Sequence, residues 1–441
     1  MNLSHTRRAN RKALFAILIA AAFAASFLTH SYSASPATPL SNAERIAVFD
    51  EVWQLVADKY YDPKFNGVDW NAVRGRYRPQ LESVASDKEF YSLLNRMTGE
   101  LRDAHTRVRT PQEAAARRKG ERTEAGVLIF EVEGKPVIFD VTAGSAAAEA
   151  GVKPGMVVRT VDGRPVNEAL SAIRGETGAS SSTRAAKILS YLKLIGGEPG
   201  TSLNLGLTRA DGSTLGVSLP RKTASAAPQI ITRTLASGAA YIRVTRFRSP
   251  ASKRVKEALQ KFRHAPGLIL DLRANTGGDG KEGLRIAGYF FDRKVPIARV
   301  LTRTGKPPSA FFGLFQLPPV LEAGEQGSQL YSGPLVVLVN EGTGSTSELI
   351  AGAMQEHRRA HIIGTATAGA VLGVLDHHKL RGGGTLAVSE LGLVTPSGRR
   401  LEGTGVVPDR NVPLTLRDLQ SGHDAPLEAA ENYLKKISGA N

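Results

Sequence analysis

The chain has 441 residues, a length that predicts two or three domains rather than one. Hydrophobic residues make up 41% and charged residues 22%, a balance that supports a buried core and excludes a globally disordered chain. Cysteine is absent, which excludes disulfide bonds, thiolate metal sites and a cysteine nucleophile. The formal net charge of +16 raises the question of nucleic acid or an acidic membrane surface as a partner.

Residues 1–34 have the pattern of a secretory signal peptide. Four basic residues between positions 7 and 12 precede an uncharged apolar run over 13–28, and small residues follow. This order is typical of a segment that is removed after export, so we expect a secreted, periplasmic protein. The alternative is an uncleaved membrane anchor, because the apolar run is only slightly shorter than a membrane span. We expect membrane contact only in that case.

The remaining positive charge is spread along the chain, with short clusters at 117–119 and 358–359. Neither cluster alternates with aromatic residues, as a surface that binds nucleic acid would. We therefore predict solvated faces at these positions and no nucleic-acid partner.

Three helices are predicted in an N-terminal helical region, residues 41–118. Apolar residues recur at helical spacing over 46–60, 70–81 and 87–101. Ser86 and Glu89 are placed to cap the third helix. The charged, alanine-rich stretch 112–123 is predicted to be a connector.

The following segment is predicted to be a small β domain. Strands are expected over 126–130, 136–141, 157–161, 202–208 and 216–219, with a short helix over 145–150. The order of these elements and of their glycines resembles a PDZ domain, here over 122–222. In such domains backbone N–H groups bind a C-terminal carboxylate and the peptide adds as a strand. The resemblance implies that the peptide-binding residues are Gly126, Val127, Leu128 and Ile129.

Strands and helices alternate in the last part of the chain, which predicts a layered α/β domain over 230–440. Apolar runs suited to buried strands occur at 239–244, 267–272, 334–339 and 360–364. Helical patterns between them cover 252–262, 281–290 and 345–357. The Pro/Gly-rich and aromatic stretch 304–329 is predicted to be a loop over one face.

Two motifs that follow buried strands suggest hydrolytic chemistry. Ser345 opens a predicted helix, where free N–H groups and the helix dipole favour developing negative charge. A serine at that place can equally be a helix cap. The motif Asp-Leu-Arg-x-Asn-x-Gly-Gly at 271–278 ends in Gly277 and Gly278, whose N–H groups can approach a ligand closely.

Together these motifs resemble the C-terminal processing, or tail-specific, protease family. The resemblance covers nearly the whole mature chain and ends with the Glu-Gly-x-Gly-Val-x-Pro-Asp run at 402–409. It implies a crotonase-like layered α/β catalytic domain, preceded by a helical region and an inserted PDZ domain. It also implies that Ser345 is the nucleophile. The oxyanion hole would comprise the N–H of Thr346 and that of Gly277 or Gly278.

The general base departs from this pattern. The tail-specific branch has a lysine 25 residues after its serine, where this chain has Ala370. A second branch, similar to the tricorn protease core and to retinoid-binding-protein repeats, carries a histidine that His105 matches. In tricorn-like enzymes a neighbouring serine and a distant glutamate support that histidine; their counterparts are Ala104 and Glu402. Neutral imidazole, with a pKa of about 6.5, is suited to accept the serine proton.

The other histidines have structural interpretations, and no cluster of His, Asp and Glu has metal-ligand spacing. The glycines at 382–384 lack the Lys-Ser/Thr of a phosphate loop, so we predict no metal and no cofactor.

The sequence therefore predicts a secreted serine peptidase that cleaves proteins or peptides through an acyl-enzyme. The alternative is a catalytically silent relative that binds protein C-termini through its PDZ domain. Ala370 favours this alternative, whereas His105 with Glu402 favours the enzyme. A third interpretation is the binding of an apolar ligand, as the likeness to retinoid-binding repeats allows.

Overall fold

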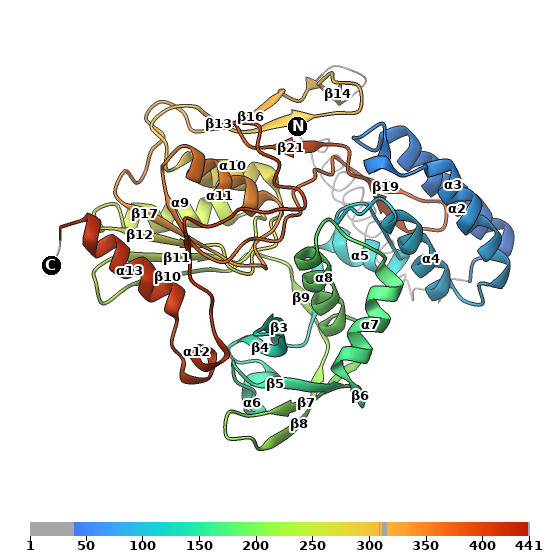
Figure 1. The fold of residues 1–441 in the computed structure, drawn as a ribbon, viewed down its shortest axis with the longest axis horizontal. Helices are drawn as coiled ribbons and strands as arrows, with labels where there is room; N and C mark the ends of the chain where they lie inside the picture. Colours follow the sequence, from blue (N-terminus) through green and yellow to red (C-terminus); the bar gives the residue numbers. More distant parts are fainter. Residues whose placement is uncertain (1–38, 308, 311–314, 440–441) are drawn as a thin grey trace, which may run out of the picture. The chain divides into compact units, whose positions relative to one another are not determined.

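The computed structural model describes residues 39–307, 309–310 and 315–439, and the chain divides into two units after residue 40. The predicted signal peptide lies outside the described residues. The unit that begins at Ser41 contains all of the elements below (Figure 1). Among the described helices, none has the length and apolar character that a membrane span requires.

The N-terminal helical region contains the three predicted helices. They are α2 (Asn42–Lys59), α3 (Trp70–Tyr77) and α4 (Asp87–Gly99), and a short 3-10 turn, η2 (Phe65–Gly67), lies between the first two. Ser86 caps α4 as predicted, because its hydroxyl accepts a hydrogen bond from the N–H of Glu89. The second helix is shorter than predicted and continues as a 3-10 helix, η3 (Arg78–Ser83). Pro79 explains the change, since proline cannot donate the helical hydrogen bond.

The predicted connector at 112–123 is in fact structured. It forms α5 (Pro111–Lys119), which a capping box of Thr110 and Glu113 begins, and β2 (Glu121–Glu124), which pairs with β9 (Lys222–Ser225). Just before α5, β1 (Arg107–Arg109) pairs with β20 (Thr385–Ala387), which pairs in turn with β19 (His377–Lys379). This three-stranded sheet joins the end of the helical region to the C-terminal part of the chain.

The middle of the chain forms an antiparallel sheet whose five long strands follow the prediction closely. Their order is β3 (Val127–Val132), β4 (Lys135–Val141), β5 (Val157–Val161), β7 (Ser202–Thr208) and β8 (Thr214–Pro220). The short elements α6 (Ala146–Glu149) and β6 (Arg164–Pro165) lie between these strands in sequence. Two helices in the same segment, α7 (Val166–Thr177) and α8 (Thr183–Ile195), were not predicted. In this sheet β3 is an edge strand, and α8 packs against it.

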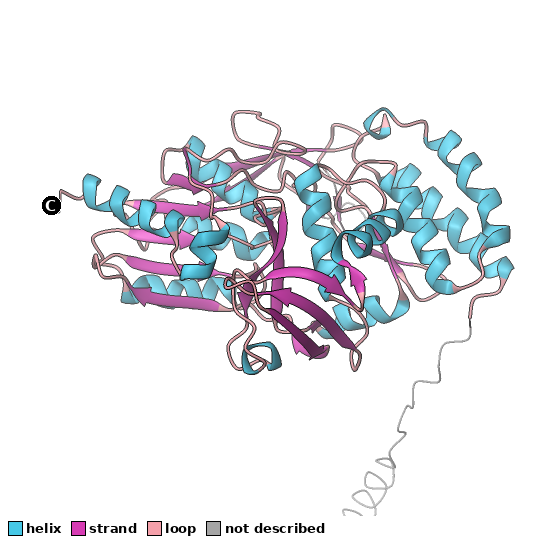
Figure 2. Ribbon diagram, turned by 60° about the horizontal axis from the view of Figure 1, so that its bottom comes forward, coloured by secondary structure: helices cyan, strands magenta, loops and turns pink. Residues whose placement is uncertain are grey.

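The last part of the chain is a six-stranded sheet with helices on both faces (Figures 1 and 2). The strands are, in order, β10 (Ile230–Thr234), β11 (Ala240–Val244), β12 (Leu268–Asp271), β17 (Leu335–Val339), β18 (His361–Gly364) and β22 (Arg410–Asn411). All neighbouring pairs are parallel except the first.

Alternate residues of the buried strands contribute to the two faces. Leu270 and Val337 pack into the core that includes α9 (Ala251–Lys261), α10 (Gly280–Gly288) and α11 (Thr346–Glu356). Ile269 and Val336 pack against α13 (Ala425–Ile437), which α12 (Leu416–Ser421) precedes. The prediction of a mixed α/β fold for this part of the chain is therefore confirmed.

The predicted loop at 304–329 is partly wrong. The segment contributes β16 (Val320–Ala323) to a small sheet with β13 (Val295–Leu301) and β21 (Gly392–Val394). It also contains a short pair of strands, β14 (Ser309–Ala310) and β15 (Phe315–Gln316).

Candidate active site

Ser345 lies in a sharp turn between β17 and α11. Its backbone angles are φ 55° and ψ −124°, in a region that L-residues rarely adopt. The Ser345 N–H is held by the carbonyl oxygen of Ala370 at 2.8 Å and by the Glu348 carboxylate at 3.0 Å. The residue is partly exposed, whereas both of its neighbours are buried. Strained, over-determined turns of this kind are frequent at functional sites.

The buried Glu348 carboxylate fixes this turn to the loop that follows β18. It accepts hydrogen bonds from the Thr367 hydroxyl at 2.5 Å and from the N–H groups of Gly369 and Ala370 at 2.7 and 2.9 Å. Burial raises the pKa of Glu348, although these hydrogen bonds and that from Ser345 act to lower it. Glu348 thus holds together the two segments on which the position of Ser345 depends.

The glycine loop after β12 packs directly against Ser345. A Cβ added at Gly277 would lie 2.7 Å from the Cβ of Ser345, so only glycine fits this approach. The Gly277 N–H donates to Asn275 Oδ1 at 2.9 Å. By contrast, the N–H groups of Gly278 and Thr346 form no hydrogen bond within the described part of the chain. Of the two glycines, Gly278 therefore has the free donor.

His105 lies between α4 and β1, beside a buried aspartate. Asp103 accepts hydrogen bonds from the N–H of His105 at 2.7 Å and from the hydroxyl of Thr106. The Nδ1 atom of His105 is 3.9 Å from Asp103 Oδ1, and it is buried without a hydrogen-bond partner among the described residues. Burial lowers the pKa of His105, and neighbouring arginines lower it further although Asp103 acts to raise it. Neutral imidazole is thereby favoured.

A cluster of four buried alanines connects the segment of His105 with that of Ser345. It consists of Ala104, Ala185, Ala368 and Ala370. Ala104 precedes His105, and the carbonyl of Ala370 accepts the N–H of Ser345. Ala370, which occupies the position of the lysine in the tail-specific branch, is only 7% exposed and packs within this alanine cluster. Within the described residues no hydrogen bond links the side chains of Ser345, His105 and Glu402 to one another.

Glu402 is buried close to the same cluster. Its Oε2 accepts the N–H of Val371 at 2.7 Å, and its Oε1 is buried with no partner among the described residues. Burial, and secondarily the charge of Asp103, raises the pKa of Glu402 to about 7. A substantial part of this carboxyl population is therefore protonated at neutral pH.

Ser181 is a residue of this site that the sequence analysis missed. Its hydroxyl accepts the N–H of Ala104 at 2.9 Å and lies beside Glu402, whose pKa it acts to lower. It comes from the loop before α8, in a run of three serines at 180–182. That run was the available signal, because three adjacent serines before a helix supply more hydroxyls than one cap requires.

The start of α8 is bound to the loops around Ser345. The Ser182 hydroxyl caps α8 and donates to the carbonyl of Ala368 at 2.5 Å. The Arg184 guanidinium donates to the carbonyls of Thr367 and Thr404 at 2.7 and 2.6 Å. A helix of the middle segment therefore holds the loops around Ser345 in place.

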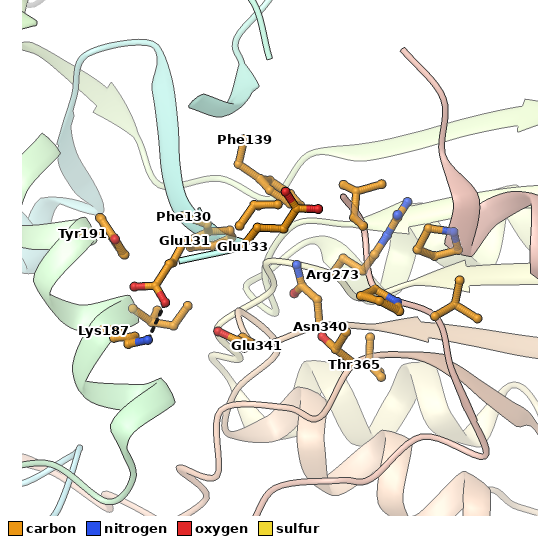
Figure 3. Close-up of a pocket in the computed structure, with 17 residues that line it drawn as sticks. Phe130, Glu131, Glu133, Phe139, Lys187, Tyr191, Arg273, Asn340, Glu341 and Thr365 are labelled. Atoms are coloured by element: carbon orange, nitrogen blue, oxygen red, sulfur yellow. Dashed lines mark hydrogen bonds and ion pairs between the residues drawn. The ribbon is translucent and has the colours of Figure 1, made fainter. Parts of the chain in front are cut away.

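A cavity of about 150 Å³ lies between β3, α8 and the loop that follows β17 (Figure 3). Phe130, Lys187 and Tyr191 line it on one side and Glu341 on the other. The ion pair of Lys187 Nζ with Glu131 Oε1, 2.5 Å long, joins α8 to β3.

Of the four predicted peptide-binding residues, Gly126 precedes β3 and the other three begin it, and none of them lines this cavity. Val127 and Ile129 are instead buried in the core of the sheet, and Leu128 is partly exposed. Gly126 has a positive φ of 76°, and a Cβ there would lie 2.6 Å from Ser145 Oγ. The cavity is lined by the second half of β3, from Phe130 onward.

The remaining histidines near the C-terminal strands have partners of their own. His357 Nε2 lies 2.7 Å from the carbonyl of Pro296, and His378 Nε2 lies 3.1 Å from Glu390. His361 stacks on Tyr433. Lys379, the lysine nearest after Ala370, is exposed on β19.

Comparison with known proteins relates two parts of the chain to known peptidase domains. Residues 238–412 match the model of peptidase family S41, and residues 41–99 match the tricorn protease C1 domain. A carboxyl-terminal-processing protease of Synechocystis is 28% identical over 423 residues, which are 91% of this chain and 90% of that protein. The chloroplastic carboxyl-terminal-processing peptidase 2 of Arabidopsis thaliana is 28% identical over 84% of this chain and 69% of its own.

A solved structure agrees with these matches. The photosystem II D1 C-terminal processing protease is 26% identical, with a TM-score of 0.57 over 88% of this chain and 97% of that chain. Sequence and fold therefore lead to one conclusion: the chain contains a domain of peptidase family S41 and a tricorn protease C1 domain, and over most of its length it is similar to the carboxyl-terminal-processing proteases, which are serine peptidases.

Proposed function

We propose that this protein is an exported serine peptidase in which Ser345 attacks the peptide bond and His105 is the general base. One observation carries the proposal: the strained turn of Ser345 packs against Gly277 and places two free backbone donors beside it. These donors are the N–H groups of Gly278 and Thr346, and the latter also lies at the positive end of α11.

The chemistry follows from these positions. Neutral His105 takes the hydroxyl proton as Ser345 Oγ bonds to the scissile carbonyl carbon, and the N–H groups of Gly278 and Thr346 stabilise the resulting oxyanion. Protonated His105 then donates to the leaving amine, which yields an acyl-enzyme. A water molecule, activated by His105 in the same way, releases the acyl product and regenerates the serine. Catalytic hydrogen bonds that are long in a free enzyme commonly tighten when substrate binds.

We assign positioning roles to Glu402 and Ser181. In the tricorn-like branch a serine is adjacent to the histidine, and Ala104 occupies that position in this chain. Ser181 binds the backbone of Ala104 from another segment and lies beside Glu402, so it supplies a hydroxyl where the adjacent residue cannot. Outer residues of this kind orient a catalytic imidazole and stabilise its charged form.

We further propose that residues 122–222 form a PDZ domain, inserted between the helical region at 41–118 and a crotonase-like domain at 230–440. The position of β3 at the edge of its sheet, with α8 packed against it, supports strand addition by a peptide. The N–H groups around Gly126, Val127, Leu128 and Ile129 would receive its terminal carboxylate. Its side chains would enter the cavity lined by Phe130 and Tyr191.

The export assignment rests on the signal-peptide pattern of residues 1–34 and has indirect support from the relatives. Several of these are named as chloroplastic or bacterial processing proteases. We therefore place the mature protein in the periplasm or an equivalent exported compartment, where protein substrates with free C-termini would reach it.

One observation favours a second candidate function, the capture of protein C-termini without hydrolysis. Ala370 removes the lysine base of the tail-specific branch, and its small side chain is buried in the alanine cluster. A silent relative would retain the peptide groove and lose turnover.

Labelling with a fluorophosphonate separates the two functions. We expect stoichiometric labelling of the wild-type protein at Ser345 and none of Ser345→Ala, with Ser347→Ala as the matched control that keeps labelling. An unlabelled wild type that still binds free-acid C-terminal peptides would establish the silent relative instead.

A further inference from the structure

Arginines from two segments flank the candidate active site. Arg107 and Arg109 follow His105 on β1. Arg246 and Arg248 flank Phe247, whose backbone pairs with the glycine loop: its N–H donates to Gly277 at 3.1 Å, and its carbonyl accepts from Asp279 at 2.7 Å. One pair is thus attached to the strand of the proposed base and the other to the oxyanion loop.

The two segments meet at the end of α5. A Cβ added at Gly120, which ends α5, would lie 2.5 Å from Nη2 of Arg248. Arg117 is in the last turn of the same helix. We call the four residues Arg109, Arg117, Arg246 and Arg248 the arginine cluster.

These guanidinium groups act on one another electrostatically. Burial first, and then neighbouring arginines, hold the pKa values of Arg109, Arg117 and Arg246 below their usual value. Within the described residues, one arginine-cluster guanidinium forms a hydrogen bond with a titratable side chain: Arg109 Nη1 lies 3.2 Å from His377 Nδ1. Burial first, and then the charges of Arg117 and Arg109, lower the pKa of His377 to about 4, so His377 is neutral and adds no positive charge.

Among the described residues no carboxylate forms an ion pair with the arginine cluster, and Glu113 acts on Arg109 only through its charge, which partly offsets the lowering of that pKa. Other arginines of the protein are paired, for example Arg243 with Asp140 at 3.0 Å and Arg273 with Asp271 at 2.6 Å. The partial negative charge at the C-terminal end of α5 stabilises the positive charges of Arg117 and Arg248. It does not explain how the charges of Arg109 and Arg246 are stabilised. The buried nitrogen atoms without a hydrogen-bond partner in the described residues belong to other side chains. The guanidinium nitrogens of the arginine cluster that have no partner are therefore accessible to solvent.

We propose that the arginine cluster is a subsite for a carboxylate of the peptide substrate, an inference that rests on the proposed peptidase function. Guanidinium groups bind carboxylates through paired, charge-assisted hydrogen bonds, and a bound anion would remove the repulsion among the four. A peptide lying across Ser345 would pass between β1 and the oxyanion loop. Its carboxylate is either an acidic side chain near the scissile bond or the C-terminus itself.

Matched fluorogenic peptides test this subsite and distinguish the two sources. One pair differs by Glu or Gln beside the scissile bond, and a second pair differs by a free or amidated C-terminus. In Arg246→Gln and Arg248→Gln we expect KM to rise about tenfold or more for the preferred acidic peptide and less than twofold for its neutral partner, with kcat little changed. Arg118→Gln, an exposed neighbour on α5, is the matched control and should behave as wild type.

Binding to Ser345→Ala separates failure of this subsite from failure of the proposed function. Fluorescence anisotropy should show tighter binding of the acidic peptide, lost with Arg248→Gln and retained in part with Arg248→Lys, even if the wild type hydrolyses neither peptide. Equal loss for acidic and neutral peptides, or no loss for either, would overturn the proposal. So would binding of anionic vesicles or an oligonucleotide that depends on Arg248 while the peptides show no acid preference.

Discussion

At the scale of single residues, the backbone of Ser345 has a strained conformation that a glycine would adopt without strain. A side chain at φ 55° and ψ −124° is strained, by about 1–3 kcal/mol in comparable positions. We expect Ser345→Gly to be more stable than Ser345→Ala by about 1 kcal/mol, and both to lose hydrolysis. Urea denaturation of the two variants checks this. Equal stabilities would mean that the turn relaxes and carries no strain.

The lowered pKa of His105 predicts the acid limb of the pH–rate profile. Only neutral imidazole accepts the serine proton, so kcat/KM should rise with pH through an ionisation below 6.5. His105→Ala should lower turnover by about 10²–10⁴-fold, whereas Lys379→Ala, on exposed β19, should change little. Loss of activity in Lys379→Ala alone would assign the base to lysine.

Glu402 predicts a pH dependence of stability with the opposite sign to that of a paired carboxylate. Its pKa of about 7 in the folded protein exceeds the usual glutamate value of 4.5, so folding favours the protonated form. The free energy of unfolding should therefore fall as pH rises from about 4.5 to 7, by an amount on the order of 3 kcal/mol. Glu402→Gln should remove most of this fall in denaturation curves measured between pH 5 and 8. An unchanged slope would place the titration elsewhere.

Several of these residues could be predicted from sequence because their motifs follow buried strands directly. Ser345 and the two glycines are local features of a strand and the loop after it. The choice between Gly277 and Gly278 could not be predicted, since it depends on the side chain of Asn275. Ser181 could not be identified either, because only the folded chain brings it to Ala104, 77 residues away.

At the scale of elements, α8 was the main omission. Its apolar residues match those of an ordinary core helix, and nothing in the sequence indicates that its first turn binds loops nearly two hundred residues later. The error at 112–123 has a different cause. Charged residues and alanines suggested a linker, but the capping box of Thr110 and Glu113 begins a helix there.

The contacts of Arg184 predict a separation between activity and global stability. Arg184→Ala removes hydrogen bonds to the carbonyls of Thr367 and Thr404, so amide exchange in the loop at 367–370 should accelerate. We expect kcat to fall about tenfold with a loss of stability of only about 1 kcal/mol. Lys193→Ala, which removes an exposed ion pair at the other end of α8, is the control and should leave both unchanged.

A wild-type kcat in Arg184→Ala, together with faster exchange in the loop, would show that the loop can loosen without affecting catalysis. Slower turnover with unchanged exchange would assign Arg184 a role in substrate contact instead.

At the scale of the whole molecule, the order of segments was predictable because the spacing of hydrophobic residues differs from one segment to the next. Helical spacing gives way to strands near residue 126, and alternating units begin near residue 239. The way in which distant segments meet was not predictable. The pairing of β1 with β20 brings the end of the helical region to the C-terminal part, and no local pattern encodes that register.

The groove beside β3 predicts the form of peptide that binds the intact protein. A free carboxylate should be required, so a free-acid peptide should bind Ser345→Ala at least tenfold more tightly than its amide. Isothermal titration calorimetry measures both affinities. Equal affinities for acid and amide would contradict carboxylate recognition, and Tyr191→Ala should weaken a peptide that enters the cavity.

Because α8 contacts the cavity beside β3 through Lys187 and Tyr191 and the loops around Ser345 through Ser182 and Arg184, we expect a ligand bound at one place to change the free energy of binding at the other. Such coupling is reciprocal for equilibrium binding. The factor by which a groove peptide tightens a reversible transition-state analogue at Ser345 must equal the factor by which the analogue tightens the peptide. If both proposed sites are correct, a tight-binding inhibitor at Ser345 would therefore also change the affinity for protein C-termini, and a non-cleavable C-terminal peptide would change the potency of the inhibitor.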